Sequence, residues 1–166
     1  HGPTFPRRAC RRKVCEDGAM QVSSETVLPA PIERAWEVLM RWEDQAIWMK
    51  DADSVTVVSP HREGVGVVLA VKTRVLNVPL FTEKLEVVEW EPPTRLLMAH
   101  RSFIHGTGEW SFRAVEGGTL FRWSEDISLP VPLLGEIALQ VYRPFMRYLM
   151  RGALEGLRAF VARGAA

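Results

Sequence analysis

Ala30-Pro31-Ile32-Glu33-Arg34-Ala35-Trp36 is the stretch where a strand gives way to a helix, and it sets the order of the elements that follow. Residues 21–28, just before it, have the pattern of a β-strand. Pro29 and Pro31 end that strand. Pro31 also suits the first turn of a helix, where the backbone N–H that proline lacks would have no partner. The sequence therefore predicts a strand followed directly by a helix.

This helix is expected to have one apolar face, formed by residues at amphipathic spacing: Ile32, Ala35, Trp36 and Leu39. A second, short helix is expected around residues 43–49. Two short helices thus separate the first strand from the rest of the chain.

A long run of strand-like segments makes up the middle of the chain. Bounded by turn residues, these segments cover residues 54–59, 64–76, 80–90, 95–102, 106–115 and 120–129. Glu116-Gly117-Gly118-Thr119 is the strongest hairpin signal, because glycine readily adopts positive φ. Together with the first strand, these segments predict a seven-stranded antiparallel sheet.

The chain then ends on a long amphipathic helix that reaches about residue 163. Its apolar stripe is expected to comprise Leu134, Ile137, Ala138, Val141, Phe145, Tyr148, Leu149, Leu157, Phe160 and Val161. Pro144 is expected to kink this helix or divide it in two. Gly152 and Gly156 are poor helix formers. They mark either a close approach to a ligand or another backbone, or a tolerant surface position.

Length and composition describe one ordinary globular domain. The chain has 166 residues, of which 47% are hydrophobic and 25% charged, with a formal net charge of +1. Five basic and two acidic residues give residues 1–19 a charge of +3, which leaves −2 for residues 20–166. A slightly acidic body lacks the excess of basic residues that contacts nucleic-acid phosphates, so nucleic acid is not expected as a partner.

Residues 1–19 are expected to be a disordered or non-native basic extension, and residues 20–166 to form the single domain. Cys10 and Cys15 both lie in the extension and form neither a disulfide framework nor a zinc site. A body without cysteine suits the cytoplasm. No segment reaches the ~18 consecutive apolar residues of a membrane span. A transient membrane or protein partner is left open.

Several short motifs occur together in a familiar order. They are Leu28-Pro29-Ala30-Pro31 with Trp36 and Leu39, Trp48, Val88-Glu89-Trp90-Glu91-Pro92-Pro93 with Arg95-Leu96, Gly117-Gly118-Thr119, and the closing helix. In this pattern, residues 20–163 resemble the helix-grip fold of the START, birch-pollen-allergen and polyketide cyclase superfamily (SRPBCC). The resemblance is strongest to small bacterial polyketide cyclase/dehydrase and coenzyme-Q-binding-like proteins.

The resemblance implies an α+β fold in which a curved, seven-stranded antiparallel sheet wraps around the long C-terminal helix. It further implies an apolar cavity between sheet and helix that holds lipids, sterols, quinones, polyketides or other ring systems. It implies no shared catalytic residue, because a fold alone does not define a function.

Side chains on the concave face of such a sheet either form the core or line the cavity. The apolar residues expected there are Phe81, Leu85, Met98, Trp110, Phe112, Phe121, Trp123, Val141, Phe145, Tyr148 and Leu149. Large aromatic side chains at such positions belong to the core more often than to a ligand platform. The partner expected is a hydrophobic small molecule, and no cofactor is expected.

Two polar residues on this face are weak candidates for catalysis. Glu125 follows Trp123 on the apolar face of the last strand, where burial raises a carboxyl pKa toward values useful in acid–base chemistry. The alternative is a bulge that turns Glu125 outward, or a bond to Arg143 or Arg147. His100 is also expected to point inward, either as a base or as a satisfied core residue.

Other catalytic chemistry has little support in the sequence. His100, His105 and Glu109 match no established metal motif, so no metal is expected. There is no nucleophile elbow, phosphate-binding loop or zinc-protease motif. Three functions stay open: binding or transport of a hydrophobic molecule, which is favoured; a cyclase or dehydratase that uses Glu125 or His100; and a protein-interaction module.

Overall fold

The computed structural model describes residues 20–75, 78–130 and 134–164. The first part of the chain forms β1 (Met20–Leu28), α1 (Ile32–Leu39), a short 3-10 helix (Trp42–Asp44) and α2 (Gln45–Trp48). The remaining strands are β2 (Ala52–Val57), β3 (Val68–Val75), β4 (Val78–Glu91), β5 (Arg95–Arg101), β6 (His105–Val115) and β7 (Gly118–Ser128). The chain continues as α3 (Leu134–Gly164).

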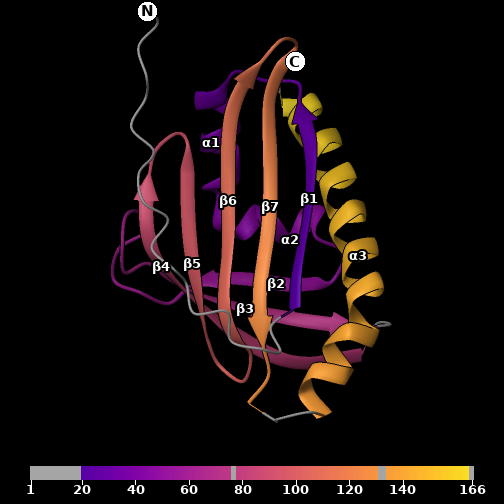
Figure 1. Cartoon of the computed structure of the whole chain (residues 1–166). Helices are drawn as coiled ribbons and strands as arrows, with labels where there is room; N and C mark the ends of the chain where they lie inside the picture. The colour runs from indigo at the N-terminus through magenta and orange to yellow at the C-terminus, as the bar shows by residue number, and fades with distance from the viewer. Residues whose placement is uncertain (1–19, 76–77, 131–133, 165–166) are drawn as a thin grey trace, which may run out of the picture.

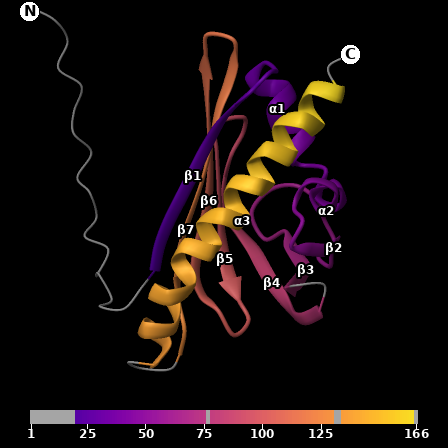
Figure 2. The same ribbon diagram turned by 90° about the vertical axis from the view of Figure 1, so that its right-hand side faces the viewer.

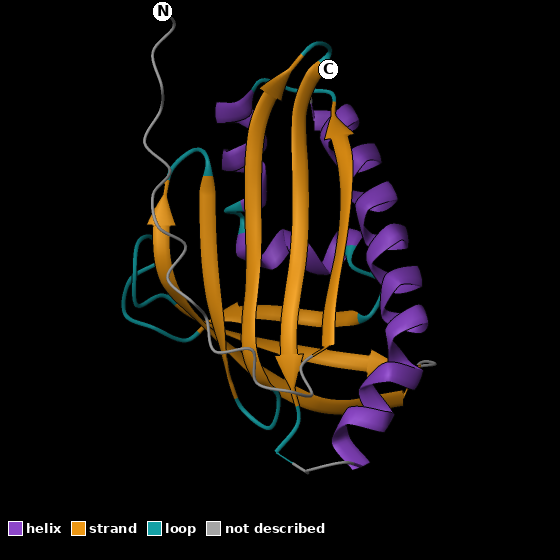
Figure 3. Cartoon of the chain, viewed as in Figure 1, coloured by secondary structure: helices purple, strands orange, loops and turns teal. Residues whose placement is uncertain are grey.

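All seven strands form one antiparallel sheet in the order β1-β7-β6-β5-β4-β3-β2. Figure 1 shows β2 and β3 crossing behind the lower parts of the long strands β6 and β7, so the sheet is strongly curled. In Figure 2, α3 runs diagonally across the open side of this sheet, alongside β1. Figure 3 shows the three α-helices on the same side. The predicted helix-grip architecture is therefore confirmed.

The hairpin between β6 and β7 packs against the junction between β1 and α1. Gly117 adopts φ +83°, and Val115 pairs with Gly118, so the turn is tight. A side chain on Gly118 would place its Cβ 2.0 Å from the carbonyl oxygen of Leu28, which explains glycine at this position. The buried Thr119 hydroxyl then donates a hydrogen bond of 2.8 Å to the Ala30 carbonyl.

The core lies between the concave face of the sheet and the helices. Its largest fully buried side chains include Trp42, Trp48, Trp110 and Phe121. Trp110 and Phe121 meet edge to face, with ring centroids 5.8 Å apart. Each such ring removes roughly 150–250 Å² from water. The part of the interior next to α1 and α2 is consequently filled by aromatic side chains.

The rotational phase of the first half of α3 differs from the expected one, whereas Leu157 and Val161 in the second half are buried as expected. The side of α3 toward the sheet carries the buried residues Leu139, Met150, Ala153, Leu154, Leu157 and Val161. Val141 and Tyr148, expected to line the interior, are instead 73% and 72% exposed. The first half of α3 is apolar on nearly every side, so periodicity alone did not select the inner stripe. The helix also continues through Pro144, so the predicted division does not occur.

Gly156 and Gly152 of α3 correspond to the two alternatives predicted for them, a close approach to another backbone and a tolerant position. A Cβ on Gly156 would lie 2.8 Å from the Trp48 carbonyl oxygen, so this glycine lets α3 approach the backbone of α2. Gly152 has nothing within 4 Å of such a Cβ and is a tolerant position. Among the described residues, no helix is both long and apolar enough to cross a membrane.

Candidate functional site

Three ionisable side chains converge on the concave face of the sheet: Glu83 from β4, His100 from β5 and Glu125 from β7. Alternation along each strand turns them inward, since Glu83 is in phase with Leu85, and Glu125 with Trp123. All three are largely removed from solvent. Glu83 is 5% exposed, Glu125 is 7% exposed, and the side chain of His100 is 12% exposed.

His100 lies between the two carboxylates. Its Nε2 is 3.0 Å from Oε2 of Glu125, within hydrogen-bonding distance, and its Nδ1 is 3.4 Å from Oε1 of Glu83. The other oxygen of Glu125, Oε1, accepts a hydrogen bond of 2.6 Å from Nε1 of Trp123. Glu125 is thus held by two neighbours, and the imidazole ring is oriented by Glu125.

His100 and Glu125 lie on strands that are not neighbours, and the intervening strand β6 leaves room for their side chains to meet. β6 lies between β5 and β7, and its Gly106 pairs with His100 while its Gly108 pairs with Glu125. A Cβ on Gly108 would lie 2.7 Å from Oε1 of Glu125, so this glycine leaves room for the carboxylate, whereas a Cβ on Gly106 would meet the backbone of Asp126. Long-range contact across an intervening strand is therefore possible at this point of the sheet.

Burial and charge act on the protonation of this cluster in different ways. Burial lowers the pKa of His100, but the hydrogen bond and charge of Glu125 and the charge of Glu83 outweigh it, so the pKa is raised from its ordinary value. Burial raises the pKa of Glu83, and the nearby His100 offsets only part of that effect. His100 and Glu83 therefore keep their protons to a higher pH than they would in water.

Glu83 is the functional candidate that sequence reasoning missed. Among the described residues, neither of its carboxyl oxygens makes a hydrogen bond, although both are buried and Oε1 faces Nδ1 of His100 at 3.4 Å. Buried polar groups are normally satisfied, so Glu83 has unused capacity to bind a proton or a ligand. The signal was present in the sequence, because Glu83 alternates in phase with Leu85 and Val87 on an otherwise apolar face.

The remaining predicted site residues fall into three groups by exposure. Met98, Trp110, Phe112, Phe121 and Trp123 are buried in the core. Leu85, Phe145 and Leu149 are half-buried. Phe81 is 44% exposed and, like Val141 and Tyr148, does not belong to the core. The concave face thus brings together Leu85 and Met98 with the polar cluster.

The outward bulge considered for Glu125 does not occur, because β6 and β7 pair in regular register through this position. Glu125 also contributes to a polar groove of about 370 Å³, lined mainly by outward-facing residues of the sheet such as Ser124 and Asp126, together with Arg143 and Arg147 of α3. No ion pair between Glu125 and these arginines occurs among the described residues.

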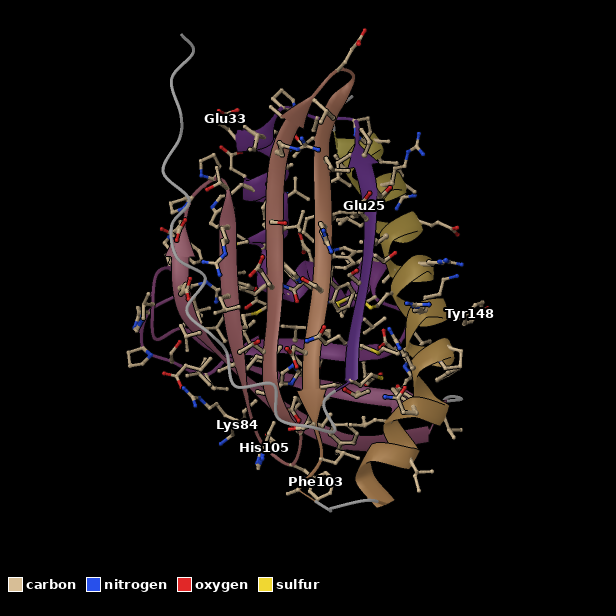
Figure 4. All side chains as sticks on the ribbon, in the orientation of Figure 1. Glu25, Glu33, Lys84, Phe103, His105 and Tyr148 are labelled. Atoms are coloured by element: carbon tan, nitrogen blue, oxygen red, sulfur yellow. The ribbon has the colours of Figure 1, made fainter. Side chains whose placement is uncertain are left out.

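The residues considered as metal ligands do not gather. Figure 4 shows His105 at the lower end of the molecule, where it is exposed. Glu109 accepts a hydrogen bond of 3.1 Å from the Arg95 guanidinium on the outer face of the sheet. In the described part of the chain, no group of three or more histidine, cysteine, aspartate or glutamate residues is arranged to hold a metal ion.

Comparison with known proteins places this arrangement in a family. Residues 19–162 match the family described as "Polyketide cyclase / dehydrase and lipid transport". The chain belongs to this family. A comparison with curated proteins gave no significant match. The cluster of Glu83, His100 and Glu125 is thus a feature of a polyketide cyclase/dehydrase and lipid transport family member.

Solved structures agree on the fold of this family member. TTHA0849 from Thermus thermophilus has a TM-score of 0.76 and 21% identity, with 89% of this chain and 100% of that chain covered. The ZhuI aromatase/cyclase from Streptomyces sp. R1128 has a TM-score of 0.70 and 14% identity, covering 89% and 96%. Ara h 8.0201 has a TM-score of 0.60 and 14% identity, covering 88% and 99%.

Proposed function

We propose that this protein binds a hydrophobic, polyketide-like small molecule on the concave face of its sheet and transfers protons to and from it. The observation that carries the proposal is the position of His100, inside the sheet and between the carboxylates of Glu83 and Glu125. A buried imidazole oriented by a carboxylate is an arrangement suited to general acid–base catalysis.

In this proposal, each member of the cluster has a separate role. His100 exchanges protons with the ligand, and Glu125 orients the imidazole and stabilises its protonated form. Trp123 holds the Glu125 carboxylate in place through the hydrogen bond from Nε1. Glu83 has oxygens free of other hydrogen bonds among the described residues, so it is available to a polar group of the ligand.

The reaction class that fits these roles is ring closure or loss of water in a molecule with several carbonyl groups. A base removes a proton from the carbon beside one carbonyl, and the resulting enolate carbon forms a bond to a second carbonyl carbon. The alkoxide formed there takes up a proton; removal of a second proton from the carbon between this hydroxyl and the first carbonyl, with protonation of the hydroxyl, then forms a C=C bond and releases water. The family description and the fold shared with aromatase/cyclases support this class of substrate.

Passive carriage of a hydrophobic molecule is the second candidate. Around the cluster, the concave face presents Leu85 and Met98, and the family description includes lipid transport. In this case, Glu83 and His100 would anchor the polar end of the cargo without changing it. The two candidates share the binding site and differ in whether His100 exchanges protons with the bound molecule.

Two measurements test the proposal in sequence. Native mass spectrometry and organic extraction of freshly purified protein, followed by titration with quinones, fatty acids and aromatic polyketides, identify a ligand. A bound ligand that carries a ketone is then incubated in D₂O, and deuterium uptake beside the ketone is followed by mass spectrometry. His100→Gln is compared with His105→Gln, which changes an exposed histidine.

We expect wild-type protein and His105→Gln to accelerate deuterium uptake, and His100→Gln to lose roughly 10²–10⁴-fold of that acceleration while still binding the ligand. Ligand binding without any acceleration by the wild-type protein would favour the carrier. Absence of binding across the whole panel would contradict both candidates.

A further inference from the structure

The outward face of the first half of α3 exposes large apolar side chains. Ile137, Val141 and Tyr148 are 62%, 73% and 72% exposed. Their spacing places them on one side of the helix, and Figure 4 shows Tyr148 pointing away from the sheet. Apolar residues grouped along one helix, rather than scattered singly, indicate an interaction surface.

This face is not needed for the packing of α3 on the sheet. The opposite side of the helix carries the buried residues Leu139, Met150 and Leu154. α3 is therefore apolar on two sides, one against the core and one toward solvent. A second apolar face lowers solubility, and it is expected where a binding partner covers it.

Arginines border the exposed apolar face. Arg147 and Arg151 are exposed, and with Arg143, Pro144 and Tyr148 they line a surface groove of about 480 Å³. Among the ion pairs of the described side chains, none involves these three arginines. The surface is thus both apolar and cationic.

We propose that this face of α3, formed by Ile137, Val141, Arg147, Tyr148 and Arg151, docks on a bilayer that contains anionic lipids. Helices at a bilayer surface insert apolar side chains at the boundary with the acyl chains, while neighbouring arginines meet lipid phosphates. Tyrosine is enriched at the same depth because its ring is apolar and its hydroxyl is polar. The composition of the face matches each of these requirements.

A second copy of the chain fits this face less well than a bilayer. In a symmetric dimer, the same patch on each copy would meet its counterpart. Arg147 and Arg151 of one copy would then approach those of the other, and like charges oppose such a contact. The sequence of α3 contains two acidic residues, Glu136 and Glu155, against five arginines, so the helix as a whole is positively charged.

Docking at this face would place the bilayer beside the groove to which Glu125 contributes. Arg143 and Arg147 line both the groove on α3 and the groove that borders Glu125. A hydrophobic ligand could then pass between lipid and protein without crossing bulk water. This inference does not depend on catalysis, because a carrier and an enzyme would need the same exchange of ligand.

Vesicle co-sedimentation of the full chain tests the docking. Vesicles of phosphatidylcholine with about one-third phosphatidylserine are compared with pure phosphatidylcholine, using wild type, Ile137→Ser/Val141→Ser and Arg147→Gln/Arg151→Gln. Val65→Ser is the matched control, since Val65 is 61% exposed in the loop between β2 and β3, which Figure 1 places on the other side of the molecule from α3. Circular dichroism checks that each variant is folded.

We expect wild type and Val65→Ser to partition onto the anionic vesicles. The arginine pair variant should lose about 25-fold in partitioning, at roughly five-fold for each arginine, and the apolar pair variant about ten-fold or more. Equal binding by all variants would overturn the proposal and assign any binding to another surface, including the basic residues 1–19. Absence of wild-type binding to either vesicle would overturn it outright.

Hydrogen–deuterium exchange of the wild-type chain keeps the test independent of variants that fail to fold. Peptides within residues 137–151 should gain protection when anionic vesicles are added. Protection of these peptides in the absence of vesicles, together with a dimeric mass by light scattering, would assign the face to a second copy instead.

Discussion

Gly108 leaves the space that the Glu125 carboxylate occupies: a Cβ built on Gly108 would lie 2.7 Å from Oε1 of Glu125. The two residues pair directly across β6 and β7. Because Gly108 does not have a positive φ, backbone conformation is not the reason for glycine here. The reason is room for a charged group that must reach His100.

Gly108→Ala is therefore expected to destabilise the protein by about 1–3 kcal/mol, because the added methyl group displaces the Glu125 carboxylate from His100. Urea unfolding gives the free energy. The matched test is a double-mutant cycle with Glu125→Ala, in which the cost of Gly108→Ala should shrink because the obstructing carboxylate is gone. Equal costs in both backgrounds would show that Gly108 does not act through Glu125.

Trp123→Phe should cost more stability than Trp110→Phe. Both indole rings are buried, but Nε1 of Trp123 donates to Glu125, whereas Nε1 of Trp110 has no hydrogen-bond partner among the described residues. Loss of the Trp123 donor leaves a buried carboxylate oxygen unsatisfied, which adds about 1–3 kcal/mol to the shared loss of packing. Equal unfolding free energies for the two variants would contradict the assigned role of Trp123.

The ionisation of Glu83 and His100 should make the protein less stable as pH rises, beginning above pH 4.5 for Glu83 and above pH 6.5 for His100. The folded state raises the pKa of both His100 and Glu83, so it holds protons that the unfolded chain has released. Their contributions are complete below the ordinary values of 6.5 for His100 and 4.5 for Glu83, and each is lost as pH rises through the folded-state pKa. Unfolding in urea between about pH 5 and pH 9 measures this slope.

Glu83→Gln should flatten the dependence of stability on pH. The neutral amide cannot lose a proton, and it removes a charge that raises the pKa of His100. The variant should therefore gain stability relative to wild type as pH rises. Glu86→Gln, on the opposite face of the same strand, is the control and should keep the wild-type slope. A constant offset between Glu83→Gln and wild type at every pH would contradict the assignment.

The glycines of α3 provide a matched pair of substitutions. Gly152→Ala should stabilise the protein by up to about 1 kcal/mol, since alanine favours the helix and nothing lies near its methyl group. Gly156→Ala should destabilise the protein, because its methyl group would press against the Trp48 carbonyl oxygen at 2.8 Å. Thermal unfolding by circular dichroism compares the two, and a stabilising Gly156→Ala would show that α3 shifts easily against α2.

The sequence was sufficient for the order of the elements and for the face of each strand. Strand periodicity turned Glu125 and His100 inward, and proline and glycine marked the ends of β1 and the hairpin between β6 and β7. These features depend on neighbours close in the chain, which a sequence displays directly. Even Glu83 was accessible to this reasoning, because its phase with Leu85 is a local property.

Only the tertiary structure decided that Glu83, His100 and Glu125 meet. Their contact depends on strand order, on the room that Gly108 leaves in β6 and on the register shift between Val87 and Glu89 in β4, none of which follows from periodicity. The phase of α3 was undecided for a related reason. A helix that is apolar on several sides is oriented by the surface it packs on, and the curled sheet that provides that surface exists only once the chain has folded.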